Sequence, residues 1–134
     1  MYKLSKRSLE RLEGVNPILI EIIQEGIKES PFDFGIPNFG GLRTAEEQKQ
    51  LYDKRLSKCD GYKNKSYHQS GNAFDIYAYV DGKASWNRIQ LKLIARHLQK
   101  VAKEKFNIKL DWGGDFKTFV DMPHFEIKKD NLYP

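Results

Sequence analysis

The stretch SYHQSGNAFD, residues 66–75, places a histidine and an aspartate, His68 and Asp75, seven positions apart. Gly71 lies between them and permits a positive φ or a close backbone approach. Residues 72–80 alternate as a strand, so Asp75 lies among mostly apolar side chains. A carboxylate in such a strand is costly to bury unless it is paired or binds a metal ion.

A second stretch, DMPHFE at residues 121–126, adds another histidine and another carboxylate, His124 and Asp121. With His68 and Asp75, His124 completes a set of two imidazoles and one carboxylate. Such a set leaves the fourth tetrahedral position of a zinc ion open for water, as in catalytic zinc sites. Asp121 is then a spare carboxylate near a ligand, which suits a general base acting on that water. The sequence therefore predicts a catalytic site with one zinc ion.

The third histidine, His97, lies inside the longest predicted helix, which begins at residue 85 or 86 and runs to about 105. Leu93 and Val101 lie four residues to either side of it. We therefore expect a packed or surface helix histidine at this position, not a metal ligand.

The remaining pattern predicts an α+β fold, in which helices flank a small, mainly antiparallel sheet that carries the ligands. Asn16 and Pro17 begin one helix, and Thr44 with Glu47 forms a capping box for another, whose apolar side is expected to be Leu51, Tyr52 and Leu56. In all, helices are expected at 5–12, 17–27, 44–58 and 85–105, and strands at 32–36, 72–80, 106–110 and 124–127.

Length and composition favour a single catalytic domain over residues 1–134, without a repeat, a linker or a separate cell-wall-binding domain. One cysteine, Cys59, cannot form an intramolecular disulfide, which suits a reducing cytosol. No apolar segment follows the basic N-terminus, so no signal peptide is expected, and no run is long enough to insert into a membrane. The net charge of +5 favours anionic partners such as cell-wall polymer, nucleic acid or lipid headgroups, and selects none of them.

Arg43 precedes the Thr44 cap and follows the Gly40-Gly41 pair. A guanidinium held there between a turn and a rigid helix start is suited to recognising a carboxylate. The alternative is a solvated loop arginine.

The combined motifs resemble those of the VanY-like zinc peptidases of the LAS type, which include D-alanyl-D-alanine carboxypeptidases and phage L-alanyl-D-glutamate endopeptidases. They are S-x-H-x-x-G-x-A-x-D at 66–75 and D-x-x-H at 121–124. G-L-R-T-x-x-x-Q at 41–48 and W-G-G-D-F at 112–116 are similar to that family in order and spacing. Phe116 stands where the family commonly has tryptophan. The resemblance extends from about residue 34 to 126 and is greatest to the phage endolysins.

This resemblance implies the hedgehog/DD-peptidase-like fold and assigns roles to individual residues. It makes His68, Asp75 and His124 the zinc ligands and Asp121 the base. Arg43 would position substrate or stabilise developing negative charge, and Ser66 would lie beside the substrate.

The function implied is a monomeric phage endolysin, a zinc-dependent L-alanyl-D-glutamate endopeptidase that acts on bacterial peptidoglycan. It would wait in the host cytoplasm until another protein permeabilises the membrane, and would then reach the cell wall. One alternative is a D-alanyl-D-alanine carboxypeptidase of the same family. Another is a zinc-binding module that no longer catalyses, although the retained Asp121 argues against it. A third, a basic nucleic-acid-binding domain, lacks a concentrated Lys/Arg patch interleaved with aromatic residues.

Overall fold

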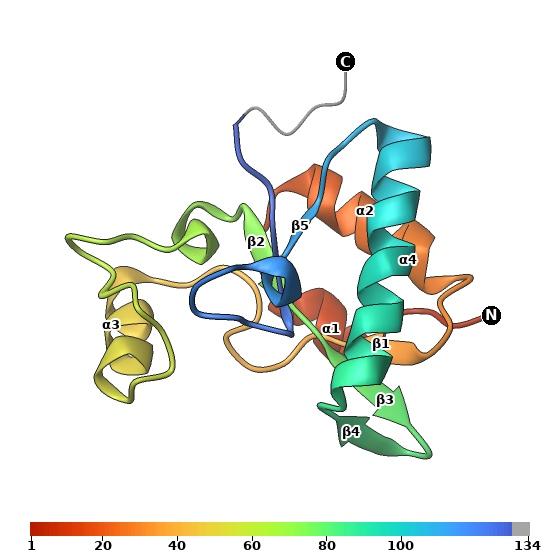
Figure 1. Ribbon diagram of the computed structural model, residues 1–134, viewed down its shortest axis with the longest axis horizontal. Coiled ribbons are helices and arrows are strands. Elements are labelled where there is room, and N and C mark those ends of the chain that lie inside the picture. Colours follow the sequence, from red (N-terminus) through yellow and green to blue (C-terminus); the bar gives the residue numbers. More distant parts are fainter. Residues whose placement is uncertain (130–134) are drawn as a thin grey trace.

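Figure 1 shows the computed structural model of the chain, in which residues 1–129 are described. Its helices are α1 (Lys6–Arg11), α2 (Pro17–Ile27), α3 (Ala45–Asp53) and α4 (Arg88–Phe106), with the 3-10 turns η1 (Tyr67–Ser70) and η2 (Gly113–Asp115). Its strands are β1 (Asp33–Gly35), β2 (Ala73–Asp75), β3 (Tyr77–Val80), β4 (Lys83–Ser85), β5 (Asp111–Trp112) and β6 (His124–Glu126).

The strands form two three-stranded antiparallel sheets, in the orders β1-β3-β4 and β2-β6-β5. The predicted α+β class with antiparallel pairing is therefore confirmed, whereas the expected single sheet is divided in two. In the second sheet, Asp75 on β2 lies opposite His124 on β6. This register brings two sequence segments together that are almost fifty residues apart.

The predicted strand over residues 72–80 is interrupted at Ile76. Its first half, β2, belongs to one sheet and its second half, β3, to the other. Ile76 lies between them, fully buried, and its N–H donates to the carbonyl of Pro123 at 3.0 Å. Side-chain alternation continues through such a change of sheet, so the sequence pattern does not reveal it.

Two other predicted elements have different bounds in the structure. The helix expected to reach residue 58 ends at Asp53, because the chain turns back through Arg55, which has a φ of 62°. Leu56, expected on its packed side, is 64% exposed. The strand expected at 106–110 is shifted to β5, since α4 continues to Phe106 and ends at a left-handed Asn107.

The helix starts at Asn16 and Thr44 are confirmed. The Asn16 side chain accepts from the N–H of Ile18 at 3.1 Å. Thr44 accepts from the N–H of Glu47 at 3.0 Å, and the Glu47 carboxylate accepts in return from the Thr44 N–H at 2.8 Å. Both caps satisfy backbone donors that a helix leaves unpaired at its first turn.

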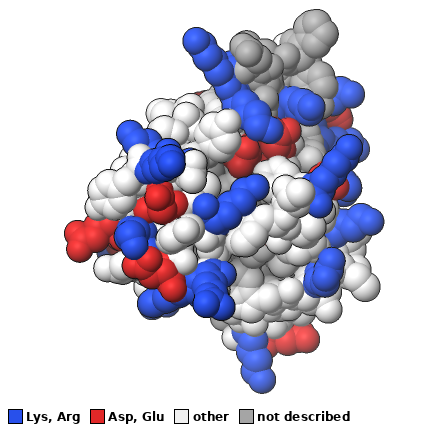
Figure 2. Space-filling view, turned by 60° about the vertical axis from the view of Figure 1, so that its left-hand side comes forward, with Lys and Arg blue, Asp and Glu red and all other residues white. Residues whose placement is uncertain are grey.

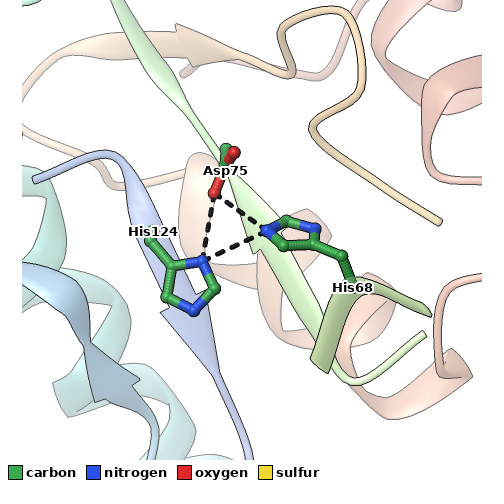
Figure 3. Close-up of side chains that lie close together, drawn as sticks. All are labelled: His68, Asp75 and His124. Carbon is green, nitrogen blue, oxygen red and sulfur yellow. Dashed lines mark hydrogen bonds and ion pairs between the residues drawn. The ribbon is translucent and has the colours of Figure 1, made fainter. Parts of the chain in front are cut away.

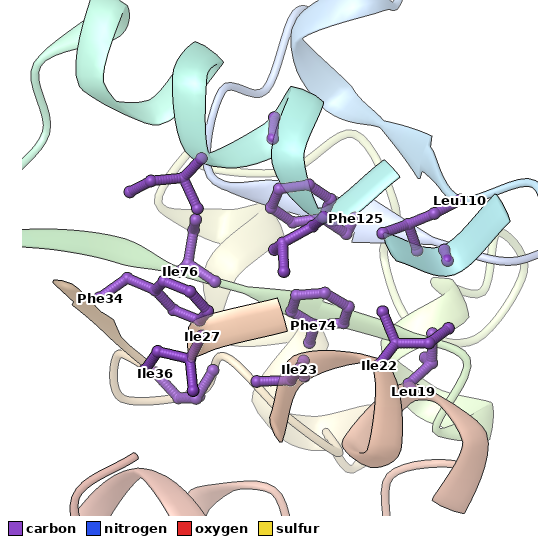
Figure 4. Close-up of a cluster of buried hydrophobic side chains, with 14 of the residues drawn as sticks. Leu19, Ile22, Ile23, Ile27, Phe34, Ile36, Phe74, Ile76, Leu110 and Phe125 are labelled. Carbon is purple, nitrogen blue, oxygen red and sulfur yellow. The ribbon is translucent and has the colours of Figure 1, made fainter. Parts of the chain in front are cut away.

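The hydrophobic core lies between the helix pair α2 and α4 and the strands that carry the sequence motifs (Figure 4). In Figure 1, α3 and the loop after it lie on the opposite side of the molecule from this helix pair. No helix in residues 1–129 has both the length and the apolar character needed to cross a membrane. The largest fully buried side chains are Phe74, Phe125, Leu12, Leu19, Ile22, Ile23, Ile27, Ile36, Ile76, Leu91, Ile94 and Leu98.

At the centre of this core, Phe74 stacks on Phe125 with ring centroids 4.9 Å apart. Each is the immediate neighbour in sequence of a predicted ligand. We expect Phe74→Ala to lower the free energy of unfolding by about 3–5 kcal/mol, because the truncation leaves a cavity between β2 and α2. Urea denaturation followed by circular dichroism measures this loss. Tyr79→Ala on β3, where the side chain is 44% exposed, is the matched control, and an equal loss in both variants would contradict the expectation.

Candidate metal centre and active site

The structure brings the side chains of His68, Asp75 and His124 together at one point (Figure 3). His68 Nε2 lies 3.2 Å from Asp75 Oδ1 and 3.1 Å from His124 Nδ1, and His124 Nδ1 lies 3.3 Å from the same aspartate oxygen. The three atoms thus form a nearly equilateral triangle. His68 comes from η1, Asp75 from the end of β2 and His124 from the start of β6.

This triangle has the size expected for a zinc site. Zinc bonds of about 2.0–2.1 Å place neighbouring ligands of a tetrahedron about 3.3–3.4 Å apart. The donor set is also of the kind that binds zinc, with two imidazole nitrogens and one carboxylate oxygen. The described residues therefore could hold a metal ion at this point.

The His68 ring is oriented by a hydrogen bond on its far side. Its Nδ1 donates to the carbonyl of Gly41 at 2.9 Å, and the side chain is fully buried. Because Nδ1 carries the proton in this arrangement, the lone pair of Nε2 points toward Asp75 and His124. Such carbonyl–histidine contacts fix the tautomer of metal-binding histidines.

Local capping holds η1, which carries His68. The Ser66 hydroxyl accepts from the N–H of His68 at 3.2 Å, and the Gln69 side chain accepts from the N–H of Ser66 at 2.9 Å. Gly71 ends the turn with a φ of 78°, as a left-handed residue between the two ligands. Ser66, predicted to lie beside the substrate, thus also holds the backbone of His68.

The His124 ring is oriented in the same way, by Glu126. Its Nε2 donates to Glu126 Oε1 at 2.7 Å. Burial lowers the pKa of His124, but the hydrogen bonds to Asp75 and Glu126 outweigh it and raise that pKa to about 9. The acidic surroundings thus favour a cation at Nδ1, and a metal ion would take the place of the proton there.

Asp75 is held from both sides. Its Oδ1 faces the two histidines, and its Oδ2 accepts from Arg43 Nη2 at 2.9 Å. Burial raises the pKa of Asp75, but the neighbouring His68 and His124 outweigh it and hold that pKa well below the usual range. The carboxylate is therefore charged and has one oxygen directed at the metal position.

Arg43 is a mostly buried side chain that donates three hydrogen bonds within the protein, and not a solvated loop arginine. It is 11% exposed, and besides the contact with Asp75 its Nε donates to the Phe39 carbonyl at 2.7 Å. Its Nη1 donates to Gln48 Oε1 at 3.0 Å. Arg43 therefore orients the Asp75 carboxylate, while its predicted role in binding substrate stays a prediction.

Asp121 lines the same cleft. Its N–H donates to the Gly113 carbonyl at 3.0 Å, and its own carbonyl accepts from the N–H of His124 at 3.1 Å. A Cβ on Gly113 would clash with the Asp121 carbonyl, so this close approach requires glycine. Burial first, and then the charge of Asp75, raise the pKa of the Asp121 carboxyl. A carboxylate with a raised pKa beside a metal position is suited to accept a proton.

The cleft has a volume of about 700 Å³ and contains the metal position. Aromatic side chains from several loops line it, together with residues 56–59 of the loop after α3. The ring centroid of Phe116 lies 5.9 Å from that of His124. The aromatic lining residues are Phe39, Tyr67, Trp86, Phe116 and Phe119.

His97 lies outside this group, as predicted. Its Nε2 is 2.7 Å from the Gly26 carbonyl, where it links α4 to α2. The sequence reasoning assigned no role to two residues at the site, Glu126 and Gln48, although Gln48 ends the G-L-R-T-x-x-x-Q motif. Glu126 follows His124 by two positions on a strand, so its side chain points to the same face, and this spacing was a usable signal.

Comparisons with known proteins agree with the geometry. A family model described as phage L-alanyl-D-glutamate peptidase matches residues 1–132. The chain is 30% identical over 128 residues to the L-alanyl-D-glutamate peptidase of Escherichia phage T5, covering 96% of this chain and 90% of that relative. It is also similar to the crystal structure of the Serratia marcescens L-Ala D-Glu endopeptidase ChiX, with a TM-score of 0.82 and 31% identity over 95% of this chain and 90% of that one.

Proposed function

Because the chain belongs to the phage L-alanyl-D-glutamate peptidase family and is therefore a hydrolase, we propose that it is a zinc-dependent endolysin that cleaves the L-Ala–D-Glu bond of peptidoglycan. The observation that carries the zinc dependence is the triangle of His68, Asp75 and His124, whose donor atoms lie 3.1–3.3 Å apart in a cleft shared with Asp121.

Zinc bound at this point would supply a water molecule acidic enough to attack at neutral pH, and would polarise the scissile carbonyl. Asp121 takes the proton from the attacking water and returns it to the amine that leaves. Gly41 and Glu126 hold the two histidine rings in place, and Arg43 holds Asp75. Little reorganisation is then needed when the substrate enters.

Arg43 and Ser66 are proposed to contribute to substrate binding as well. Arg43 lines the cleft, and its positive charge favours the carboxylate of D-Glu or the charge that develops on the carbonyl oxygen. The Ser66 hydroxyl accepts from the N–H of His68, which leaves its O–H as a donor toward the cleft.

A peptidoglycan digest with and without a chelator tests the proposal. Mass spectrometry of the products should show L-Ala left on the glycan strand and a new D-Glu amino terminus, and the chelator should prevent both. Release of free D-Ala with the L-Ala–D-Glu bond intact would support the carboxypeptidase alternative. Wall binding without any product would support the non-catalytic module.

We also propose that residues 1–134 act as a single monomeric catalytic domain, retained in the host cytoplasm until the membrane is permeabilised. Sedimentation analysis of the purified chain tests the oligomeric state. Addition of the protein to intact and to permeabilised cells tests the requirement for permeabilisation. Lysis of intact host cells at the same rate as permeabilised cells would contradict the requirement for permeabilisation.

Association with the cell wall is expected to be partly electrostatic. The net charge is +5, and Lys and Arg side chains are spread over the face shown in Figure 2, interspersed with acidic ones. Raising the salt from about 0.1 M to 1 M shortens the Debye length from about 10 Å to 3 Å, so the fraction bound to purified sacculi should fall. Sedimentation with the sacculi measures this fraction, and the Asp121→Asn variant, in which hydrolysis is expected to be about 100-fold slower or more, preserves the wall during the measurement. Equal binding at both salt concentrations would indicate recognition through the cleft alone.

A further inference from the structure

Gln48 is a fully buried polar side chain on α3, a helix whose other side chains are at least partly exposed. All of its amide groups are engaged. Oε1 accepts from Arg43 Nη1 at 3.0 Å, and Nε2 donates to Ser57 Oγ and to the Cys59 carbonyl, both at 2.8 Å. A buried amide is costly unless it is satisfied in this way. An apolar side chain would fill the same space but make none of these bonds.

These contacts connect the metal centre to a wall of the cleft. On one side, Gln48 bonds to Arg43, which in turn binds Asp75 Oδ2 at 2.9 Å. On the other side, it bonds to Ser57 and Cys59, which line the cleft in a segment without regular secondary structure. Through Gln48, α3 is therefore hydrogen-bonded both to Arg43 and to the segment of the cleft wall that contains Ser57 and Cys59.

The orientation of Arg43 depends on this arrangement. Its Nε is held by the carbonyl of Phe39, a residue with a left-handed φ of 60°. With Nε fixed by Phe39 and Nη1 by Gln48, the planar guanidinium has one orientation, in which Nη2 points to Asp75. Loss of the Gln48 contact would leave the guanidinium held only by Phe39 and by Asp75, the carboxylate that it orients.

We propose that Gln48 is a positioning residue of the metal centre, which fixes the Arg43 guanidinium, and through it the Asp75 carboxylate, while ordering the cleft wall at Ser57 and Cys59. This inference rests on the proposed zinc binding. Partners beyond the ligands typically change metal affinity by about 10–100-fold when they are removed. Gln48 acts through one intermediate residue, so the lower end of this range is expected.

Three variants separate the two roles. Gln48→Met keeps the size of the side chain but loses every hydrogen bond. Gln48→Glu keeps an oxygen acceptor for Arg43 and loses the donors to Ser57 and Cys59. Ser57→Ala removes one contact with the cleft wall and leaves the contact with Arg43 intact.

Zinc affinity, measured by competition with a chromophoric chelator, reports on the metal centre. The visible absorption of the cobalt-substituted protein reports on ligand geometry. Gln48→Met should bind zinc about tenfold more weakly and show an altered cobalt spectrum. Gln48→Glu and Ser57→Ala should stay within about threefold of the wild-type affinity, because the contact with Arg43 remains.

Limited trypsin digestion reports on the cleft wall, since Lys54, Arg55 and Lys58 offer cleavage sites there. Site-resolved mass spectrometry should show faster cleavage at these positions in Gln48→Glu than in the wild type. A tenfold loss of zinc affinity in Gln48→Glu would overturn the proposal. This test does not depend on whether Gln48→Met folds. Wild-type affinity in a folded Gln48→Met would also overturn it. A wild-type chain that binds no zinc would overturn the proposed function itself.

Discussion

Replacement of both His68 and His124 by alanine is expected to abolish zinc binding and, with it, hydrolysis of peptidoglycan. The two rings supply two of the three donor atoms of the triangle, and Asp75 alone cannot hold zinc against a chelator. Metal analysis after dialysis should show about one zinc per wild-type chain and background in the double variant. Both rings are buried, so circular dichroism must accompany the metal analysis to show that the chain is folded.

The matched control is His97→Ala. The His97 side chain on α4 donates a hydrogen bond to the Gly26 carbonyl on α2. Loss of this side chain should lower the free energy of unfolding but leave the zinc content unchanged. A folded double variant with full zinc occupancy would show that the ion binds elsewhere. Loss of zinc in a folded His97→Ala variant would likewise show that the ion does not bind where it is proposed.

The convergence of His68, Asp75 and His124 was predictable because each motif has a local physical signal. Gly71 permitted a positive φ or a close backbone approach, and Asp75 was an isolated carboxylate in a strand pattern. In the pairing of β2 with β6, Asp75 lies opposite His124, and Phe74 lies opposite Phe125 with the two rings stacked. The structure brings these side chains together, and their role as zinc ligands stays a prediction.

The contacts around Gln48 were not predictable from the sequence, because they depend on chain reversals without a periodic signal. Leu51, Tyr52 and Leu56 were expected on the packed side of a longer helix, yet Tyr52 and Leu56 are exposed and the buried residue is Gln48. Helical periodicity identifies apolar faces, and here a polar residue is buried because its partners come from a loop 9–11 residues further on.

The division of the strand at Ile76 was missed for a similar reason. Alternation is the same whether a strand continues in one sheet or passes to another, so only the partner strands distinguish the cases. Those partners, β1 and β6, lie far from each other in the sequence.

Asp121→Asn is expected to lower kcat by about 100-fold or more while zinc content and thermal stability stay near the wild-type values. Asparagine has the same shape and keeps the backbone contacts with Gly113 and His124, but its amide cannot accept a proton. A general base contributes about 10²–10⁴-fold to the rate. A 100-fold loss corresponds to about 2.7 kcal/mol in the activation barrier. Initial rates of muropeptide release, measured at saturating substrate, give kcat.

The control for this variant is Asp53→Asn, which makes the same chemical change at an exposed aspartate of α3 paired with Lys49. Its rate should equal that of the wild type, since Asp53 lies outside the residues that line the cleft. A rate loss confined to Asp121→Asn, with zinc still bound, separates proton transfer from metal binding. If Asp121→Asn kept the wild-type kcat with zinc bound, another group would be the base. Asp121 would then serve only to close the turn between Gly113 and His124, where its backbone already makes two hydrogen bonds.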